Sequence, residues 1–233
     1  MKRGKFKKRS FLTLGAVMAI FASANYCPAL AADYNLNAFS QLQSALENGN
    51  YNTQGGVSQT VQSGDRLITS GTLYFGDNGI DVRQTGLTVV RENFADYMGS
   101  GTNTGFNVLN GVELTLDNLA INTFQTAVNI NNGATVNFIG GSYTSSVVNS
   151  GASDIRGGIF RNYFQTENTS ASTTTNGNVT LSGNITSGNF TSNGTLNFTG
   201  GEIAAAVNTQ LNNGSLTVNG TGSVTLNQGD AWN

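Results

Sequence analysis

The chain has 233 residues, of which 38% are hydrophobic, 10% are charged and 30 are glycine. Charged residues normally make up about 25% of a soluble domain, so this surface is unusually neutral and rich in amides and hydroxyls. The chain has no histidine and one cysteine, which excludes Ser-His-Asp and Cys-His nucleophile systems and the usual zinc sites.

Residues 1–32 have the organisation of a secretory signal peptide. Six Lys and Arg residues lie between positions 2 and 9, and an apolar run follows over residues 11–22. Small residues then form an A-x-A cleavage site in Ala29-Leu30-Ala31-Ala32. We expect cleavage after Ala31 or Ala32, with residues 1–32 as the leader. The apolar run is shorter than the roughly 20 residues of a membrane-spanning helix, so we expect no membrane insertion of the mature chain.

Removal of the leader leaves an acidic chain without lysine or cysteine. Five arginines remain against 13 acidic residues, a net charge of −8. A nucleic-acid surface needs clustered Lys and Arg to neutralise phosphates, so we expect no nucleic-acid partner. A secreted chain without disulfides but with a lysine-rich leader favours a bacterial exported protein. We expect it outside the cell or on the outer-membrane surface, with the periplasm as the alternative.

Residues 33–54 are predicted to form a short helix and a linker. Four apolar residues recur at three- and four-residue steps: Leu36, Phe39, Leu42 and Leu46. Ser40 and Gln43 have the spacing of a capping box, and Asn48-Gly49 provides a stop. We therefore expect an amphipathic helix of about two turns. It would cap the first coil of the structure that follows.

The sequence changes after Gly55 to short alternating runs between Asn and Gly. Among the Asn-Gly pairs, those at 110–111, 132–133, 176–177, 193–194 and 213–214 begin 22, 44, 17 and 20 positions apart. The longest of these steps spans two repeats, with Gly151 near its middle. Runs of β-formers follow the pairs, such as Val112-Glu113-Leu114-Thr115-Leu116 and Ala134-Thr135-Val136-Asn137-Phe138. A period of roughly 20 residues with alternating strands indicates a solenoid.

We therefore predict an all-β fold for residues 55–233, a single-stranded parallel β-helix (β-solenoid) of about eight coils. Asn and Gly accept the positive φ that sharp corners between strands need. The alternative is an antiparallel β-sandwich, whose strands also recur every 8–12 residues. Residues 165–178 are polar and of low complexity, and we expect them to form a mobile loop that bulges from one coil.

Two features together resemble a known group of proteins. The helix "FSQLQSALENG" and the Gly- and Asn-punctuated strands resemble the start of pectate-lyase-like right-handed parallel β-helix proteins. The leader and the Asn-, Thr-, Ser- and Gly-rich coils resemble the passenger domains of bacterial autotransporter adhesins. The resemblance covers residues 36–230. It implies a secreted or surface-displayed, adhesin-like β-helix with a structural or binding role and no catalysis.

This chain departs from that group at its end. Autotransporter passengers are followed by an outer-membrane barrel, whereas this chain ends in coil-like sequence, "LNQGDAWN". A truncated passenger remnant is therefore an alternative. The last coil, which ends at Trp232, has no obvious cap. We expect it to be covered by Trp232, by more chain or by end-to-end self-association with another copy.

The resemblance also implies a second function, a β-helix that binds or cleaves polysaccharides. Its carboxylates would be Asp65, Asp77 and Asp81, if these meet on one face. A calcium ion between Asp77 and Asp81 is conceivable, but two solvated turn carboxylates are the favoured interpretation. We expect no enzyme activity, no cofactor and no metal.

One stretch of the mature chain combines basic and aromatic residues, "RGGIFRNYF" at positions 156–164. Exposed aromatic side chains can stack on sugars or dock protein loops. We predict a ligand-contact patch here for a glycan or a host-surface protein. Its residues are Arg156, Phe160, Arg161, Tyr163 and Phe164.

Overall fold

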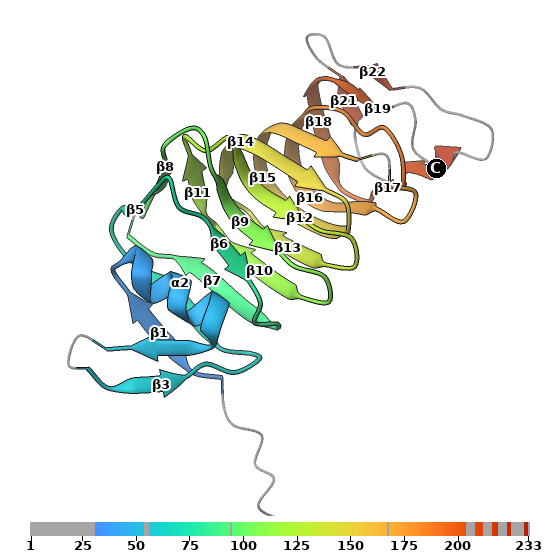
Figure 1. Cartoon of the computed structure of the whole chain (residues 1–233). Helices are drawn as coiled ribbons and strands as arrows, with labels where there is room; N and C mark the ends of the chain where they lie inside the picture. Colours follow the sequence, from blue (N-terminus) through green and yellow to red (C-terminus); the bar gives the residue numbers. More distant parts are fainter. Residues whose placement is uncertain are drawn as a thin grey trace, which may run out of the picture. The chain divides into compact units, whose positions relative to one another are not determined.

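The computed structural model describes residues 31–53, 56–93, 95–166, 168–203, 208–211, 216–218, 223–224 and 231–232. Mostly parallel strands stack as a β-solenoid of about seven turns, with one short helix near the start of this region (Figure 1). The predicted all-β solenoid is confirmed, with about seven turns where about eight were expected. Among the described residues, the helix is too short and too polar to span a bilayer.

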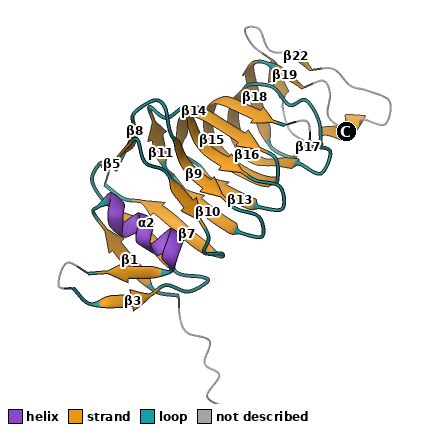
Figure 2. Ribbon diagram, viewed as in Figure 1, coloured by secondary structure: helices purple, strands orange, loops and turns teal. Residues whose placement is uncertain are grey.

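The strands form three parallel ladders, because strands of successive turns, or parts of long strands, pair side by side (Figure 2). The first ladder contains β1 (Asp33–Leu36), β4 (Arg66–Thr69), β7 (Leu87–Arg91), β10 (Glu113–Asp117), β13 (Thr135–Ile139), the starts of β15 (Ala152–Gln165) and β16 (Ser172–Ser182), β17 (Asn189–Ser192), β20 (Asn208–Leu211) and β23 (Ala231–Trp232).

The other two ladders follow the same turns. The second contains β5 (Leu73–Gly76), β8 (Tyr97–Gly99), β11 (Ala120–Asn122), the start of β14 (Ser142–Asn149), the middle of β15, the end of β16, β18 (Thr195–Gly200) and β21 (Leu216–Val218). The third contains β6 (Ile80–Val82), β9 (Thr104–Val108), β12 (Thr126–Ile130), the ends of β14 and β15, the bridging residue Ile185, β19 (Glu202–Ile203) and β22 (Ser223–Val224).

The turns differ in length although the strands stay in register. Leu114 of β10 lies beside Leu87 of β7, 27 positions earlier. Phe190 of β17 lies beside Thr173 of β16, only 17 positions earlier. The extra residues lie in the corners between ladders, where they do not change which side chains face the core.

The Asn-Gly pairs mark two different corners. Asn110-Gly111 and Asn132-Gly133 precede strands of the first ladder, and the N–H of Gly111 donates to the carbonyl of Gly133 at 3.0 Å. Asn176-Gly177 and Asn193-Gly194 instead lie between the first ladder and the second. The longest step between the pairs therefore crosses from one corner to the other. It is not two repeats of one corner.

The helix α2 (Phe39–Asn48) packs against β5 and β6 and buries Leu42, Ala45 and Leu46. Its predicted end is confirmed, because Gly49 adopts the left-handed conformation with φ 70° and its N–H donates to the carbonyl of Ala45. The predicted capping box is wrong. The N-cap is Ala38, without a side-chain hydrogen bond, and Ser40 lies inside the helix.

The beginning of the predicted helical segment is a strand. Leu36, assigned to the helical pattern, is buried in β1, which pairs with β4. After the helix in the sequence, β2 (Asn50–Asn52) and β3 (Ser58–Thr60) form an antiparallel hairpin. The predicted short helix is therefore present, but its helical pattern was extended too far toward the N-terminus.

The predicted loop at residues 165–178 is mostly strand. β16 begins at Ser172, and its first four residues pair with β15 on one side and β17 on the other. Thr173 and Thr175 are each 1% exposed. Their methyl groups fill the core and their hydroxyls find partners inside it. A run of threonines can therefore continue the solenoid without an apolar residue.

The interior changes character along the molecule. In the early turns (residues 66–148) most inward positions are apolar, and one column runs through Leu67, Val89, Leu116 and Phe138. In the late turns (residues 149–211) the same column continues through Ile155 to hydroxyl side chains. Seven buried polar residues lie in the late turns: Asn149, Ser153, Gln165, Thr173, Thr175, Ser192 and Thr209.

A hydrogen-bond network joins three of these residues, Asn149, Ser153 and Thr173, to the buried hydroxyl of Tyr163. Asn149 Nδ2 donates to Tyr163 Oη at 2.9 Å and to Thr173 Oγ1 at 3.1 Å. The Tyr163 hydroxyl lies 2.6 Å from Ser153 Oγ and 2.8 Å from Thr173 Oγ1. The adjacent strands β15 and β16 supply Ser153 and Thr173 at paired positions. Stacking in register thus brings buried hydroxyls within bonding distance of one another.

The side chains of the last turn lie outside the described part of the structure. The backbone of β23 pairs with β20 and places Trp232 beside Leu211. Coverage of this end by Trp232, by more chain or by another copy therefore stays a prediction.

Candidate functional site

A polar groove of about 580 Å³ opens on the third ladder beside the helix. It is open to solvent, and its walls come from α2, from the turn before β6, and from β6, β9 and β12. The lining residues are Glu47, Asp77, Gly79, Ile80, Asp81, Asn103, Thr104, Asn107 and Asn129.

Strand alternation places one polar residue per turn on the groove side. Asp81, Asn107 and Asn129 are paired positions of β6, β9 and β12. Each lies between two buried residues of its own strand, such as Ile80 and Val82 on either side of Asp81. Because strand neighbours point to opposite faces, the three polar side chains must face outward together.

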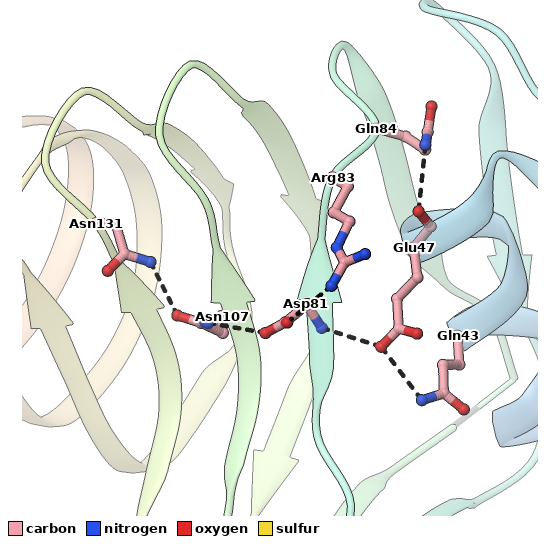
Figure 3. Close-up of polar contacts among 7 residues, drawn as sticks. All are labelled: Gln43, Glu47, Asp81, Arg83, Gln84, Asn107 and Asn131. Carbon is pink, nitrogen blue, oxygen red and sulfur yellow. Dashed lines mark hydrogen bonds and ion pairs between the residues drawn. The ribbon is translucent and has the colours of Figure 1, made fainter.

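These side chains are bonded to one another along the ladder. Asn107 Nδ2 donates to Asp81 Oδ1 at 2.8 Å, and Asn129 Nδ2 donates to Asn107 Oδ1 at 2.9 Å. Asn131 Nδ2 also donates to Asn107 Oδ1 at 2.9 Å (Figure 3). The amide–carboxylate row is therefore held in one arrangement before any ligand arrives.

Glu47 connects this row to the helix, as Figure 3 shows. Its Oε1 accepts hydrogen bonds from the backbone N–H of Asp81 and from Gln43 Nε2, each at 3.2 Å. Gln84 Nε2 donates to the backbone carbonyl of Glu47 at 3.3 Å. The groove thus contains the junction between the helix and the first strand of the third ladder.

The floor on the other side is formed by close backbone packing. Asn103 is 9% exposed; its Nδ2 donates to the carbonyl of Asn78, and its Oδ1 accepts from the N–H of Ser100 at 3.3 Å. A Cβ at Gly79 would overlap the carbonyl oxygen of Thr104 on the next turn. Glycine is therefore required at position 79 for the two turns to meet.

The groove is electronegative. Glu47, Asp77 and Asp81 carry its charge, and Arg83 pairs with Asp81 at 3.3 Å from an exposed position. Such an exposed pair screens the groove only weakly. In the described part of the chain, no three Asp, Glu, His or Cys side chains gather closely enough to hold a metal ion. The carboxylates and amides that line the groove can donate and accept hydrogen bonds, and those of Glu47, Asp81, Asn107 and Asn129 are themselves held by hydrogen bonds.

The structure does not gather the predicted contact patch into one surface. Phe160 and Tyr163 are 1% and 0% exposed and belong to the core. Phe160 stacks on Tyr143 with ring centroids 4.6 Å apart. Arg156 and Arg161 are exposed, and Phe164 is half-buried. Two of the three aromatic anchors of the predicted patch, Phe160 and Tyr163, are therefore out of reach of a ligand.

The predicted carboxylates are only partly brought together. Asp77 and Asp81 line the groove as the second functional hypothesis required, but Asp65 does not join them. Asp65 is 4% exposed at the base of the first ladder and accepts backbone hydrogen bonds there. The third carboxylate of the groove is Glu47, which the sequence analysis missed. Its position near the end of a helix expected to cap the first coil was the available signal.

The fold places the protein among the parallel β-solenoids, with a lateral hydrogen-bonding groove as its candidate site. Searches of protein families, of curated proteins and of solved structures found no match for this chain.

Proposed function

We propose that this protein is an exported, adhesin-like β-solenoid that binds a neutral, hydroxyl-rich glycan in the groove beside α2 without catalysis. The observation that carries the proposal is the bonded row of Asp81, Asn107 and Asn129, completed by Glu47. Export is supported by the leader pattern of residues 1–32.

The row suits sugar hydroxyls because it offers donors and acceptors at a fixed spacing. Each amide presents both an NH₂ group and a carbonyl, and each carboxylate accepts only. Neighbouring turns of a parallel ladder lie roughly 4.8 Å apart, so successive groups can meet successive hydroxyls of a chain. Their mutual hydrogen bonds lower the entropy that binding must remove.

The charge of the groove selects among glycans. Three carboxylates repel uronates, sulfates and phosphates, since like charges brought together at an interface disfavour the complex. A neutral oligosaccharide is therefore the favoured ligand, and an acidic polymer such as pectin is disfavoured.

The test is a binding measurement on the native exported protein with neutral and acidic oligosaccharides, by calorimetry or on an array. Asn107→Ala should weaken neutral-glycan binding at least about tenfold, because Asn107 joins Asp81 to both Asn129 and Asn131. The matched control is Asn137→Ala, another outward amide that donates to a carboxylate, Glu113, at 3.0 Å on the first ladder. Equal losses in both variants, or no glycan binding, would contradict the proposal.

A glycan-cleaving function is the second candidate, because three carboxylates share the groove. Glu47 and Asp81 already accept hydrogen bonds from the protein, which favours a holding role for both. Release of new sugar ends during the same incubation would support glycan cleavage and contradict binding without catalysis. Host-matrix proteins on the same array test the protein-ligand alternative.

Export is tested separately by fractionation of the source cell with an antibody and by protease treatment of intact cells. We expect the band in the medium or at the protease-accessible surface. A band confined to the cytoplasm would contradict export.

A further inference from the structure

The first strand begins next to a buried carboxylate. The backbone N–H of Ala32 donates to Asp65 Oδ1 at 2.7 Å, and Asp65 Oδ2 accepts the N–H of Gln62 at 2.7 Å. Asp65 is 4% exposed. The carbonyl of Ala32 accepts the N–H of Arg66 at 2.8 Å, which extends the pairing of β1 with β4 by one residue.

The backbone groups that bond Asp65 are neutral, although its carboxylate is buried. The adjacent guanidinium of Arg66 reaches outward instead and pairs with Asp33 at 3.1 Å, in an exposed ion pair. Burial and the nearby Asp65 charge both raise the pKa of Tyr34. A buried charge is costly unless an opposite charge or several hydrogen bonds compensate it.

We infer that the leader is cut between Ala31 and Ala32, and that the new α-ammonium group of Ala32 forms an ion pair with Asp65 that anchors the first strand. The inference rests on the proposed export, which supplies a leader peptidase. Hydrolysis adds one water across the amide bond. It leaves a carboxylate on Ala31 and an amine on Ala32, which takes up a proton at neutral pH.

The alternative cut, after Ala32, would dismantle this arrangement. It would remove both hydrogen bonds of Ala32 and its contact with the core. It would also place the new ammonium on Asp33, next to the guanidinium of Arg66. A cut after Ala31 has alanines at both small positions of the A-x-A site, Ala29 and Ala31.

The ion pair would change the role of the leader. Before cleavage, Ala32 offers Asp65 a neutral amide, and after cleavage it offers a cation at the same atom. Folding of the first strand is therefore completed by the event that releases the chain outside the cytoplasm. Asp65 and Ala32 are 33 positions apart, so the pair joins the N-terminus to the residue that precedes β4.

The sequence provides a selective chemical probe for this pair. Lysine occurs only at positions 2, 5, 7 and 8, so the α-amine is the single amine of the mature chain. An acylating reagent such as an N-hydroxysuccinimide ester, followed by mass spectrometry, reports the reactivity of that one group. A paired ammonium reacts slowly, because the opposite charge favours its protonated form.

The experiment uses the chain expressed with its leader in an exporting bacterium. Intact mass and N-terminal sequencing should give Ala32 as the first residue. At pH 7 the native protein should be acylated about tenfold more slowly than the same protein in urea, since below the ordinary α-amine pKa of about 7.7–8.0 each pKa unit changes the amount of free amine about tenfold. The Asp65→Asn variant should lose most of this protection. The control Asp96→Asn, which alters a half-buried carboxylate paired with Arg91, should keep it.

The outcomes separate this inference from the proposed export. A processed, exported chain that starts at Asp33 overturns the inference and leaves export intact. Equal acylation rates in native and unfolded protein also overturn it, without any variant having to fold. If the α-amine of Asp65→Asn is still acylated slowly, burial alone explains the slow reaction, and the proposed ion pair is contradicted. An unprocessed chain in the cytoplasm would overturn export and, with it, the inference.

Discussion

The early and late turns of the solenoid have the same backbone but different interiors. In the early turns, rings and branched side chains fill the space, and Phe75 contacts Phe39, Phe106 and Phe124 at centroid distances of 4.6, 5.8 and 5.1 Å. In the late turns, hydroxyls and an amide occupy equivalent inward positions and bond to one another. Each inward column of this fold is therefore stabilised either by close packing of apolar side chains or by hydrogen bonds between polar side chains.

In a stacked structure, the register of strand pairing determines which inward side chains lie next to each other. Thr175 Oγ1 donates to Ser192 Oγ at 3.0 Å because the two residues are paired positions of β16 and β17. A polar residue isolated in an apolar column would be left without a partner, at a cost of about 1–3 kcal/mol. Two or more polar residues at successive positions of a column can form hydrogen bonds with each other.

The largest expected effect comes from an early-turn ring. Phe138 is 0% exposed and lies 5.1 Å from the rings of both Tyr143 and Phe160. Phe138→Ala should lower the free energy of unfolding by about 3–5 kcal/mol, because it leaves a cavity. Urea unfolding measures this. Thr175→Ala, in the same column two turns later, should cost less than half as much, and equal losses would contradict the comparison.

The next effect distinguishes the two Asn-Gly corners. Gly111 has φ 79° and open space around its Cβ position, whereas a Cβ at Gly194 would overlap the carbonyl oxygen of Gly177. Gly111→Asn should cost less than about 1 kcal/mol, because asparagine tolerates the left-handed region. Gly194→Asn should cost about 3 kcal/mol through overpacking. If thermal unfolding showed a larger loss for Gly111→Asn than for Gly194→Asn, backbone conformation and not steric overlap would explain why glycine is needed at these corners.

A smaller effect tests the hydroxyl network directly. Thr173→Val keeps the shape but removes the hydroxyl that bonds Asn149 and Tyr163, and should cost about 2 kcal/mol. Its neighbour Thr174 points outward at the next position of β16. Thr174→Val should stay within about 0.5 kcal/mol of the parent. Both values come from parallel urea titrations, and a neutral Thr173→Val would mean that the network is dispensable.

The smallest effect at neutral pH concerns two buried tyrosines. Tyr143 Oη has no hydrogen-bond partner among the described residues, whereas Tyr163 Oη has three. Tyr143→Phe should therefore be within about 0.5 kcal/mol of the parent at pH 7. Tyr163→Phe should cost about 1 kcal/mol.

The two variants should also flatten the loss of stability at alkaline pH. Burial raises the pKa of Tyr143 and of Tyr163 above the ordinary value of 10.0. The unfolded chain therefore loses these protons first, and stability is full below pH 10 and falls above it, by up to about 1.4 kcal/mol per pH unit for each group. Unfolding measured between pH 8 and 11 should show a shallower fall for Tyr143→Phe. An unchanged slope would contradict the burial of this hydroxyl.

The early turns were predictable because their strands alternate visibly. Leu114, Leu116, Val136 and Phe138 were expected to lie on strands of consecutive coils, and they lie in adjacent interior columns. The run Ser172–Asn178 contains no apolar residue, so alternation could not identify it as strand. Thr173 and Thr175 are buried, and the hydroxyl of Thr173 bonds Asn149, 24 positions earlier. Such distant partners cannot be found from the local sequence pattern.

The candidate site was predictable only in part for a similar reason. Asp77 and Asp81 were predicted as candidate carboxylates of one face. Glu47, in contrast, contacts Asp81 across 34 positions, and this contact depends on how the helix lies over β6. The proposed patch at 156–164 assumed one surface for a segment that turns corners inside β15. The alternation of inward and outward side chains is interrupted near Gly157-Gly158, where the register of pairing with β16 also shifts.

The unequal turn lengths have a practical consequence for engineering and for evolution. A turn that advances the chain by 17 positions and one that advances it by 27 positions keep the same strand pairing, so added sequence is absorbed at the corners. A foreign epitope grafted between two strands should leave the scaffold intact, because it changes no pairing. A single residue inserted into β13 would reverse the direction of every later side chain in that strand. Natural variation in relatives of such a molecule should therefore concentrate in whole corner loops and spare the strands.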